Sequence, residues 1–320
     1  MRIQLRPATP ADRPALLDLF RSAFEASADA ADWAWKYDAN PNPGVSALAL
    51  LGDRVVGFYG GFGTRYRGAE GNLPGVSAVD VMTHPDARAL SHRALFQDLG
   101  EAYCRFNLEA GVPFYFGFPH ERHRILGERL LGYRSAGPAG EWTRPLSSPP
   151  LLGRLRRRLL RVSTGDALSP AHAALAEALH ARPGWRTDRS LATLSWRLAR
   201  PGARYRVHEL RDTRGRSSGY AVVRTVGERA LAVDLQLADE ESAALAYLVD
   251  AVSEAERGRG TTCLVVRAPR DTRLGTRLLE LGFSRAAPTT HFEVRPLDPA
   301  FDLARAAPAF DYRFLDHDIF

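Results

Sequence analysis

The sequence predicts an α+β chain with two tandem domains, each a mixed, mostly antiparallel sheet flanked by helices. Three observations support this: landmarks recur in the same order in both halves, strand-like and helix-like patterns alternate in each, and a proline-rich stretch separates them. The matched landmarks are Trp35 with Trp196, Gly57 with Gly219, Asp80 with Asp234, and Gly132-Tyr133 with Gly282-Phe283. We expect a domain at 1–146, a linker with a basic helix at 147–168, a second domain at 169–296 and a tail at 297–320.

The first half opens on a short strand and two helices. The strand leads into a helix that Thr9 can cap, with Pro10 at the first helical position. A second helix carries Trp33, Trp35 and Tyr37 and ends at the breaker sequence NPNPG. Aromatic residues two positions apart point to different faces of a helix, so we expect Trp35, which Trp196 mirrors, to lie in the core.

Strands and helices then alternate to the end of the first domain. The turn dipeptide Gly52-Asp53 joins two strands, and the nearly continuous apolar run VSAVDVMT predicts an interior strand. A long helix ends at Gly111, the strand PFYFGF follows, and a further helix precedes the closing strands at Tyr133.

The second half repeats this order. We expect a helix from Ser169, strands at 205–210, 220–226 and 230–237, a helix at 240–257, a strand at 261–267, a helix at 272–281 and closing strands to Val294. The tail has no counterpart in the first half, and its aromatic residues predict that it packs onto the body.

Composition bounds the class of protein. The 320 residues are 45% hydrophobic and 25% charged, as in globular domains. No apolar run approaches the roughly 20 residues of a membrane span, and the N-terminus lacks a signal-peptide core, so a cytoplasmic protein is expected. Cys104 and Cys263 lie in apolar segments, and neither has a histidine or cysteine nearby at the spacing of metal ligands. This predicts packed free thiols and no metal site.

The densest basic run, GRLRRRLLRV, lies between the two halves. Leu155, Leu159 and Val162 recur at helical spacing, which predicts a short interdomain helix with a solvated arginine face. Phosphate or an anionic membrane surface are alternative partners. Nucleic acid is not favoured, because no aromatic residues interleave with the run.

A family resemblance rests on four segments in order: RPATPADRPALLDLF, GDRVVGFYG, VDVMTHPDAR running into a helix, and GERLLGY. This order resembles the GNAT superfamily of acyl-CoA-dependent N-acyltransferases, specifically its members with two GNAT folds in one chain. The resemblance implies acetyl-CoA or another acyl-CoA as co-substrate, a small-molecule amine as acceptor and no metal. A homodimer is compatible with it.

The resemblance also implies where the co-substrate binds. The fourth strand of the fold, here Val79, Val81 and Met82, would hold the pantetheine and thioester through its backbone. The loop entering the next helix would hold the pyrophosphate on its N–H groups. The matching positions are Arg88, Ala89, Ser91, His92 and Arg93.

Both copies depart from the family pattern at this helix start. Ala89 and Ser91 stand where the loop usually has glycine. Glycine allows a phosphate to approach the backbone more closely, and the charges of His92 and Arg93 can compensate for its absence. The corresponding stretch of the second half, EESAALAYL, begins with acidic residues that oppose a pyrophosphate. We therefore expect a cofactor-binding first copy and a degenerate second copy.

Acyl transfer to an amine needs a base for the ammonium proton and an acid for the leaving thiolate. Asp80 is a candidate base on an apolar strand; the alternative is a fold residue, since Asp234 mirrors it. His120 and Glu121 follow the strand FYFGFP and are further catalytic candidates, the alternative for His120 being a helix cap.

Many members of the family use a tyrosine on the next helix as the acid, and Glu128 occupies that place here. The acid is therefore left to Tyr115 or water. We expect Trp33, Tyr37 and Tyr115 to line the acceptor pocket.

Two other functions remain open at this stage. One is a non-catalytic GNAT-like binding or scaffold protein. The other is an aminoacyl transferase of the peptidoglycan-bridge type, which shares a paired GNAT-like fold and uses charged transfer RNA that the arginine run would suit.

Overall fold

The computed structural model describes residues 3–25, 29–42, 44–147, 160–239 and 243–317, with only the backbone at 88–93. The chain forms two compact units. The first unit comprises 1–66, 72–137 and 290–308, and the second comprises 67–71, 138–289 and 309–320. Neither unit is one continuous stretch of sequence, unlike the contiguous domains that we expected.

The sheet of the first unit runs in the order β1-β2-β3-β4-β5-β15-β6. Its strands are β1 (Ile3–Pro7), β2 (Ala47–Leu51), β3 (Arg54–Gly68), β4 (Gly71–Thr83), β5 (Phe114–Gly117), β15 (His291–Pro296) and β6 (Arg134–Pro138). β2 and β3 pair antiparallel across the expected turn, where Gly52 has φ +62°. β4 and β5 are parallel and β15 is antiparallel to β5, so the sheet is mixed as predicted.

The helices of the first unit also follow the sequence pattern. They are η1 (Pro10–Asp12), α1 (Arg13–Phe24), α2 (Ala30–Trp33), the π-helix η2 (Ala34–Asp38), α3 (Pro85–Glu109) and α4 (Glu121–Leu130). The Thr9 backbone and hydroxyl both donate to Asp12, which fixes the start of the first helix. Gly111, at φ +79°, ends α3 as expected. Leu95, Leu99 and Tyr103 anchor α3 in the core.

The sheet of the second unit runs in the order β14-β7-β13-β12-β11-β10-β8. Its strands are β14 (Ser284–Arg285), β7 (Glu141–Pro145), β13 (Cys263–Arg267), β12 (Arg229–Leu237), β11 (Ser217–Val226), β10 (Arg206–Arg211) and β8 (Arg161–Gly165). The helices α5 (His172–His180), α6 (Leu191–Leu198), α7 (Ala243–Arg257) and α8 (Arg273–Glu280) belong to the same unit. The expected helix at 240–257 is thus confirmed from Ala243 onward.

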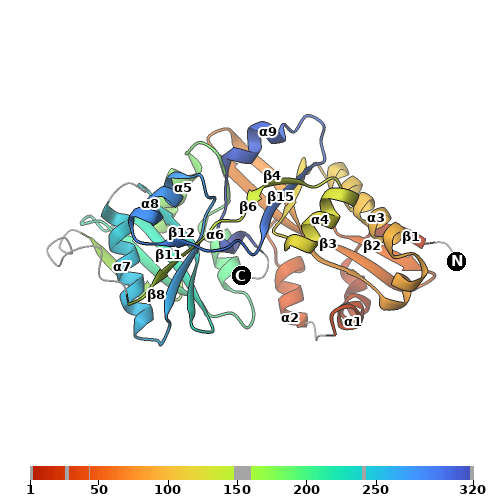
Figure 1. Cartoon of the computed structure of the whole chain (residues 1–320), viewed down its shortest axis with the longest axis horizontal. Helices are drawn as coiled ribbons and strands as arrows, with labels where there is room; N and C mark the ends of the chain where they lie inside the picture. Colours follow the sequence, from red (N-terminus) through yellow and green to blue (C-terminus); the bar gives the residue numbers. More distant parts are fainter. Residues whose placement is uncertain (1–2, 26–28, 43, 148–159, 240–242, 318–320) are drawn as a thin grey trace. The chain divides into compact units, whose positions relative to one another are not determined.

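Each sheet contains one strand from the other half of the sequence. β15, expected to close the second domain, pairs with β5 in the first sheet, where it lies in blue among orange and yellow strands (Figure 1). β7, expected to close the first domain, pairs with β13 in the second sheet. The expected ends of the two domains were therefore wrong. Apolar periodicity predicts a strand, but the ladder is made by backbone groups that do not identify the partner.

The expected linker helix is wrong in part. Val162 lies on β8, which pairs antiparallel with β10, so it is not on a helix. The spacing of Leu155, Leu159 and Val162 suits a helix, but backbone pairing with β10 makes residues 161–165 a strand. Residues 153–159 of the basic run lie outside the described part of the chain.

The tail packs on the body as predicted. α9 (Leu303–Ala306) belongs to the first unit. β16 (Phe310–Asp311) pairs with β9 (Trp185–Thr187), and η5 (Phe314–Asp316) follows in the second unit. Phe310, Tyr312 and Phe314 are buried.

Cys104 is a buried free thiol and Cys263 a partly buried one, as expected. Burial raises the pKa of Cys104 to about 12. None of the described helices has the length and apolar character needed to cross a membrane. Among the described residues, no three His, Cys, Asp or Glu side chains gather to hold a metal ion.

Candidate functional site in the first unit

The candidate site begins where β4 and β5 part. The two parallel strands pair at Val76 with Tyr115 and at Ser77 with Phe116. β4 then continues to Thr83, whereas β5 ends at Gly117. Among the described residues, β5 does not pair with β4 beyond Ser77, which leaves this edge of β4 without a neighbouring strand. Val79 and Met82 are buried there and Val81 is partly buried.

Asp80 lies on this free part of β4 in a left-handed conformation, with φ +48°. A non-glycine residue at positive φ marks a local distortion of the strand. Its carboxylate accepts hydrogen bonds from Lys36 Nζ at 3.0 Å and from the Tyr37 hydroxyl at 2.7 Å. The Lys36 and Asp80 side chains are only 7% and 14% exposed, so this is an ion pair largely removed from water.

The sequence folds this way locally because η2 turns Lys36 and Tyr37 toward β4. Gly60 on β3 makes the approach possible, since a Cβ there would lie 2.4 Å from the Tyr37 hydroxyl oxygen. Any larger residue at position 60 would displace Tyr37 from Asp80.

The aromatic residues expected at an acceptor pocket are more deeply packed than predicted. Trp33 is buried against Phe58, with ring centroids 5.5 Å apart, and lies 4.6 Å from the ring of Tyr37. Trp35 packs against Phe62 in the core, as expected. Tyr37, which is partly exposed, is the member of the set that reaches Asp80.

Tyr115 lies inside the core. It is 1% exposed, and its ring contacts those of Tyr103 and Tyr133 at 5.6 and 5.1 Å. Its hydroxyl has no hydrogen-bond partner among the described residues. Such a group is an available donor or acceptor inside the unit and not part of an open pocket wall.

The start of α3 lies beside an arginine, ion-paired with Asp86, that the sequence did not reveal. His84 caps the helix, and its Nδ1 accepts from the Asp86 backbone N–H. Arg54, on β3, lies 2.8 Å from His84 Nε2 and 3.2 Å from the Asp86 carboxylate. A guanidinium beside a helix N-terminus reinforces the positive end of the helix dipole. Arg88, Ala89, Ser91, His92 and Arg93 follow on α3, but their side chains lie outside the described part of the structure.

The start of α4 is held by charge pairs. His120 is the exposed N-cap residue, and its side chain does not cap the helix. Glu121 binds Arg124 at 2.7 Å and His291 of β15 at 2.9 Å. Arg124 also binds Glu128, at 2.6 Å. The Arg124 hydrogen bond is the main reason that the pKa of Glu121 is lowered.

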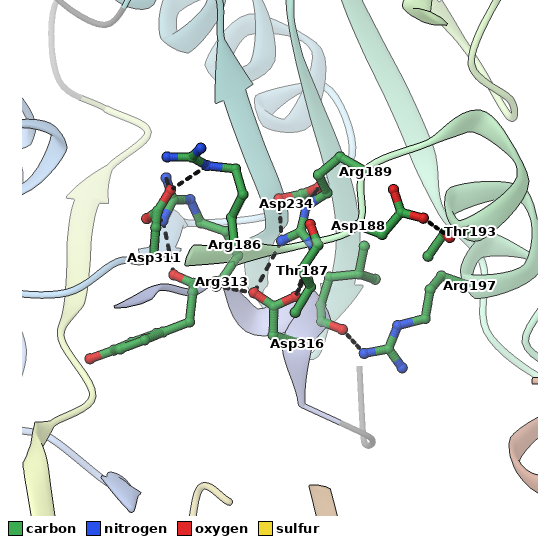
Figure 2. Close-up of polar contacts among 12 residues, drawn as sticks. Arg186, Thr187, Asp188, Arg189, Thr193, Arg197, Asp234, Asp311, Arg313 and Asp316 are labelled. Atoms are coloured by element: carbon green, nitrogen blue, oxygen red, sulfur yellow. Dashed lines mark hydrogen bonds and ion pairs between the residues drawn. The ribbon is translucent and has the colours of Figure 1, made fainter. Parts of the chain in front are cut away.

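The second unit has a different arrangement at the matching strand. Asp234, on β12, is fully buried and is bound by Arg189 Nε at 2.9 Å and by the Tyr220 hydroxyl at 2.6 Å. Arg189 also binds Asp316 of η5, with 2.8 Å between Nη1 and Oδ1. Figure 2 shows that Arg186, Arg313 and Asp311 extend this buried network.

The tail occupies the free edge of β12. β12 pairs with β13 only as far as Ala232 with Val266. Beyond this point Arg313 Nε donates to the carbonyl oxygen of Leu235 at 3.1 Å, and the Arg313 side chain is fully buried. The Arg267 guanidinium carbon lies over the Phe314 ring, 4.3 Å from the ring centroid. In the second unit, Arg313 of the tail therefore covers the edge of β12 that corresponds to the unpaired edge of β4 in the first unit.

Sequence reasoning missed Lys36 and Arg54. Lys36 did carry a signal, because it is the only lysine among 43 basic residues, yet its pairing with a residue 44 positions away depends on the fold. Arg54 had no signal, because exposed arginines are common in this chain.

Comparisons with known proteins bear on the fold. No family model matches the sequence, and a search of curated proteins finds no relative. Among solved structures, the chain is similar to a conserved protein of unknown function from Enterococcus faecalis, described as a probable N-acyltransferase. The two share 12% identity over 93% of this chain and 73% of that one, with a TM-score of 0.72.

Two further structures agree. A GCN5-related N-acetyltransferase from Anabaena variabilis is 13% identical over 93% of this chain and 73% of its own, with a TM-score of 0.70. A tandem GNAT protein from the clavulanic acid biosynthesis pathway is 16% identical over 94% of this chain and all of its own, with a TM-score of 0.56. At these identities the likeness establishes architecture alone, and the chain therefore has a tandem GNAT-like fold, as its sequence predicted.

Proposed function

We propose that this chain is a GNAT-type acyltransferase that moves an acetyl or other acyl group from acyl-CoA to the amine of a small molecule, by direct attack in a ternary complex. The observation that carries the proposal is the contrast at the parted strands. The first unit leaves the backbone of β4 available beyond Ser77, whereas the second unit covers the matching edge of β12 with Arg313.

The residues of the first unit suit an acyl-CoA. Carbonyl and N–H groups of β4 around Val79 to Met82 can bind the pantetheine amides. The first turn of α3 follows β4 directly, and Arg54 adds a cation beside it, which suits a pyrophosphate. A bound acyl-CoA would supply the activated thioester.

Asp80 remains our candidate for the base that receives the acceptor's ammonium proton. Its carboxylate is partly exposed, whereas Asp234 is fully buried among cations. Lys36 and the Tyr37 hydroxyl both donate to this carboxylate and hold it in place. His120 and Glu121 are alternative bases at the start of α4.

Calorimetric titration with acetyl-CoA and longer acyl-CoAs tests the co-substrate. We expect binding by the wild type and at least tenfold weaker binding by Arg54→Ala and by Arg88→Ala. The matched control Arg216→Ala changes an exposed arginine of the second unit and leaves binding unchanged. If no acyl-CoA binds the wild type, the proposal fails. A heat signal with RNA but with no acyl-CoA would favour the aminoacyl-transferase alternative.

Thiol release in the presence of a panel of small amines tests the base. We expect Asp80→Asn to lower kcat at least about 100-fold while acyl-CoA still binds. Asp234→Asn, measured on the folded fraction, should keep kcat within a few-fold. Equal kcat in the wild type and Asp80→Asn would make Asp80 a fold residue. Binding without turnover by any amine would favour a non-catalytic binding protein.

A further inference from the structure

Glu293 is a buried carboxyl group that the strand exchange brings into the first unit. It lies on β15 directly opposite Gly117 of β5 and is 1% exposed. Its neighbours on the same face of the strand, His291 and Arg295, bind Glu121 of α4 and Glu101 of α3. Because side chains two apart on a strand share a face, Glu293 points to the side of the sheet that α3 and α4 cover.

Neither carboxyl oxygen of Glu293 meets a hydrogen-bond donor at bonding geometry among the described residues. Burial raises its pKa to about 7; Glu128 and Glu121 add to the rise, and the Ser135 hydroxyl and Arg124 oppose it. A buried carboxylate without donors is costly, so the proton stays on this group well above the usual range. Near neutral pH, a substantial fraction of Glu293 is therefore protonated and has a proton to give.

Its position opposite Gly117 places Glu293 beside the point where β4 and β5 part. A Cβ added at Gly117 would meet nothing closer than Pro119 Cδ at 3.8 Å and the Ala78 carbonyl oxygen at 3.9 Å. Ala78 is the first residue of β4 beyond its pairing with β5. Gly117, which Glu293 faces across the ladder, thus lies against the first residue of β4 beyond the pairing of the two strands.

Neighbouring carboxyl groups are held in ion pairs, whereas the carboxyl oxygens of Glu293 have no bonded partner among the described residues. Glu128, at the place of the family's tyrosine acid, is held in an ion pair with Arg124 at 2.6 Å. Among the described residues, Glu121 on α4 and Tyr133 after α4 also interact with Glu293. His291 and Arg295 flank it on β15 and pair with Glu121 and with Glu101 of α3.

We propose that Glu293, supplied by the exchanged strand β15, is the catalytic acid that protonates the departing thiolate. This inference rests on the proposed acyl-transfer function. The acceptor nitrogen forms a bond to the acyl carbon with its lone pair, and the carbon–sulfur bond then breaks with its electron pair going to sulfur. Glu293 gives its proton to that sulfur, the base takes the proton lost by the nitrogen, and solvent exchange returns both groups to their starting states.

The test compares Glu293→Gln in the full chain with two donors, acetyl-CoA and an acetyl thioester of 4-nitrothiophenol. A nitrothiophenolate leaves without protonation, so loss of an acid should matter little for it. We expect kcat to fall about 100-fold with acetyl-CoA and less than about threefold with the aromatic thioester. The wild-type kcat with acetyl-CoA should fall as pH rises through about 7, and this limb should vanish in the variant.

Glu293→Asp and Glu109→Gln complete the design. The first keeps an acid and should recover part of the activity together with the alkaline limb. The second removes an exposed carboxylate of α3 and should change nothing. Equal losses with both donors, or an unchanged pH profile in folded Glu293→Gln, would overturn the assignment. If the wild type binds and turns over acyl-CoA while Glu293→Gln is normal, only this inference fails; if the wild type binds no acyl-CoA, both fail.

Discussion

The two units treat the same strand position in opposite ways. In the first unit Asp80 pairs with one lysine and one tyrosine and keeps some exposure. In the second unit Asp234 is fully buried and shares Arg189 with Asp316 of the tail. A duplicated fold element has thus been kept as a cation–tyrosine–carboxylate cluster in both units, but only the first leaves the strand edge beside it available. Residues repeated in both halves of the sequence therefore reflect a requirement of the shared fold. Whether a binding site remains beside them depends on which other segments pack against the strand.

The largest effect is expected from breaking the buried network of the second unit. Arg189→Met leaves the carboxylates of Asp234 and Asp316 without the cation that they share. Because the Arg189 side chain is only 3% exposed, water cannot replace it, and the free energy of unfolding should fall by about 3–5 kcal/mol. Urea unfolding followed by circular dichroism measures it. Lys36→Met should cost less, about 1–3 kcal/mol, because Asp80 keeps Tyr37 and some solvent.

Arg216→Met is the matched control, since its ion pair with Asp212 is exposed and should be worth less than about 1 kcal/mol. Replacing Asp234 and Asp316 by Asn alongside Arg189→Met should recover part of the loss. A cost for Arg189→Met no larger than that of the control would show that the network contributes little.

A second comparison uses pH, to which the units respond with opposite sign. The pKa of Glu293 in the first unit is raised to about 7, mainly by burial, so its contribution to stability is full below pH 4.5 and is lost as pH rises through about 7. The pKa of His180 in the second unit is lowered to about 4, mainly by burial and then by Arg67. Its contribution is full above pH 6.5 and is lost as pH falls through about 4.

Glu293→Gln should therefore gain about 3 kcal/mol of stability relative to the wild type between pH 4.5 and pH 8. His180→Gln, which keeps an acceptor for the Arg189 backbone N–H, should gain a similar amount relative to the wild type between pH 6.5 and pH 4. Urea midpoints measured across this pH range give both slopes. A parallel pH dependence of the wild type and either variant would contradict the corresponding assignment.

The smallest perturbation is thiol labelling, which does not change stability but separates the two units. Cys104 of the first unit is buried with a pKa raised to about 12, so it should resist a disulfide reagent at pH 8 until that unit unfolds. Cys263 of the second unit is partly exposed and should react first. Mass spectrometry of partly labelled protein identifies the sites. Early labelling of Cys104 in native protein would show that the first unit opens more readily than its packing indicates.

Several features of the fold were available to sequence reasoning because they depend on local periodicity. The strand that carries Asp80, the helix that ends at Gly111 and the packed aromatic tail all follow from patterns within a few residues. The candidate site was only partly available. Asp80 stood out by its apolar surroundings, but its ion pair with Lys36 joins residues 44 positions apart.

By itself, the sequence determined that there are two copies of one α+β fold and where most helices and strands lie. Only the tertiary structure decided which sheet receives β7 and β15, that the tail covers β12, and that Glu293 enters the first unit. The physical reason is that side-chain periodicity encodes which face of an element is buried, while backbone hydrogen bonds, common to every residue, join strands from any distance along the chain.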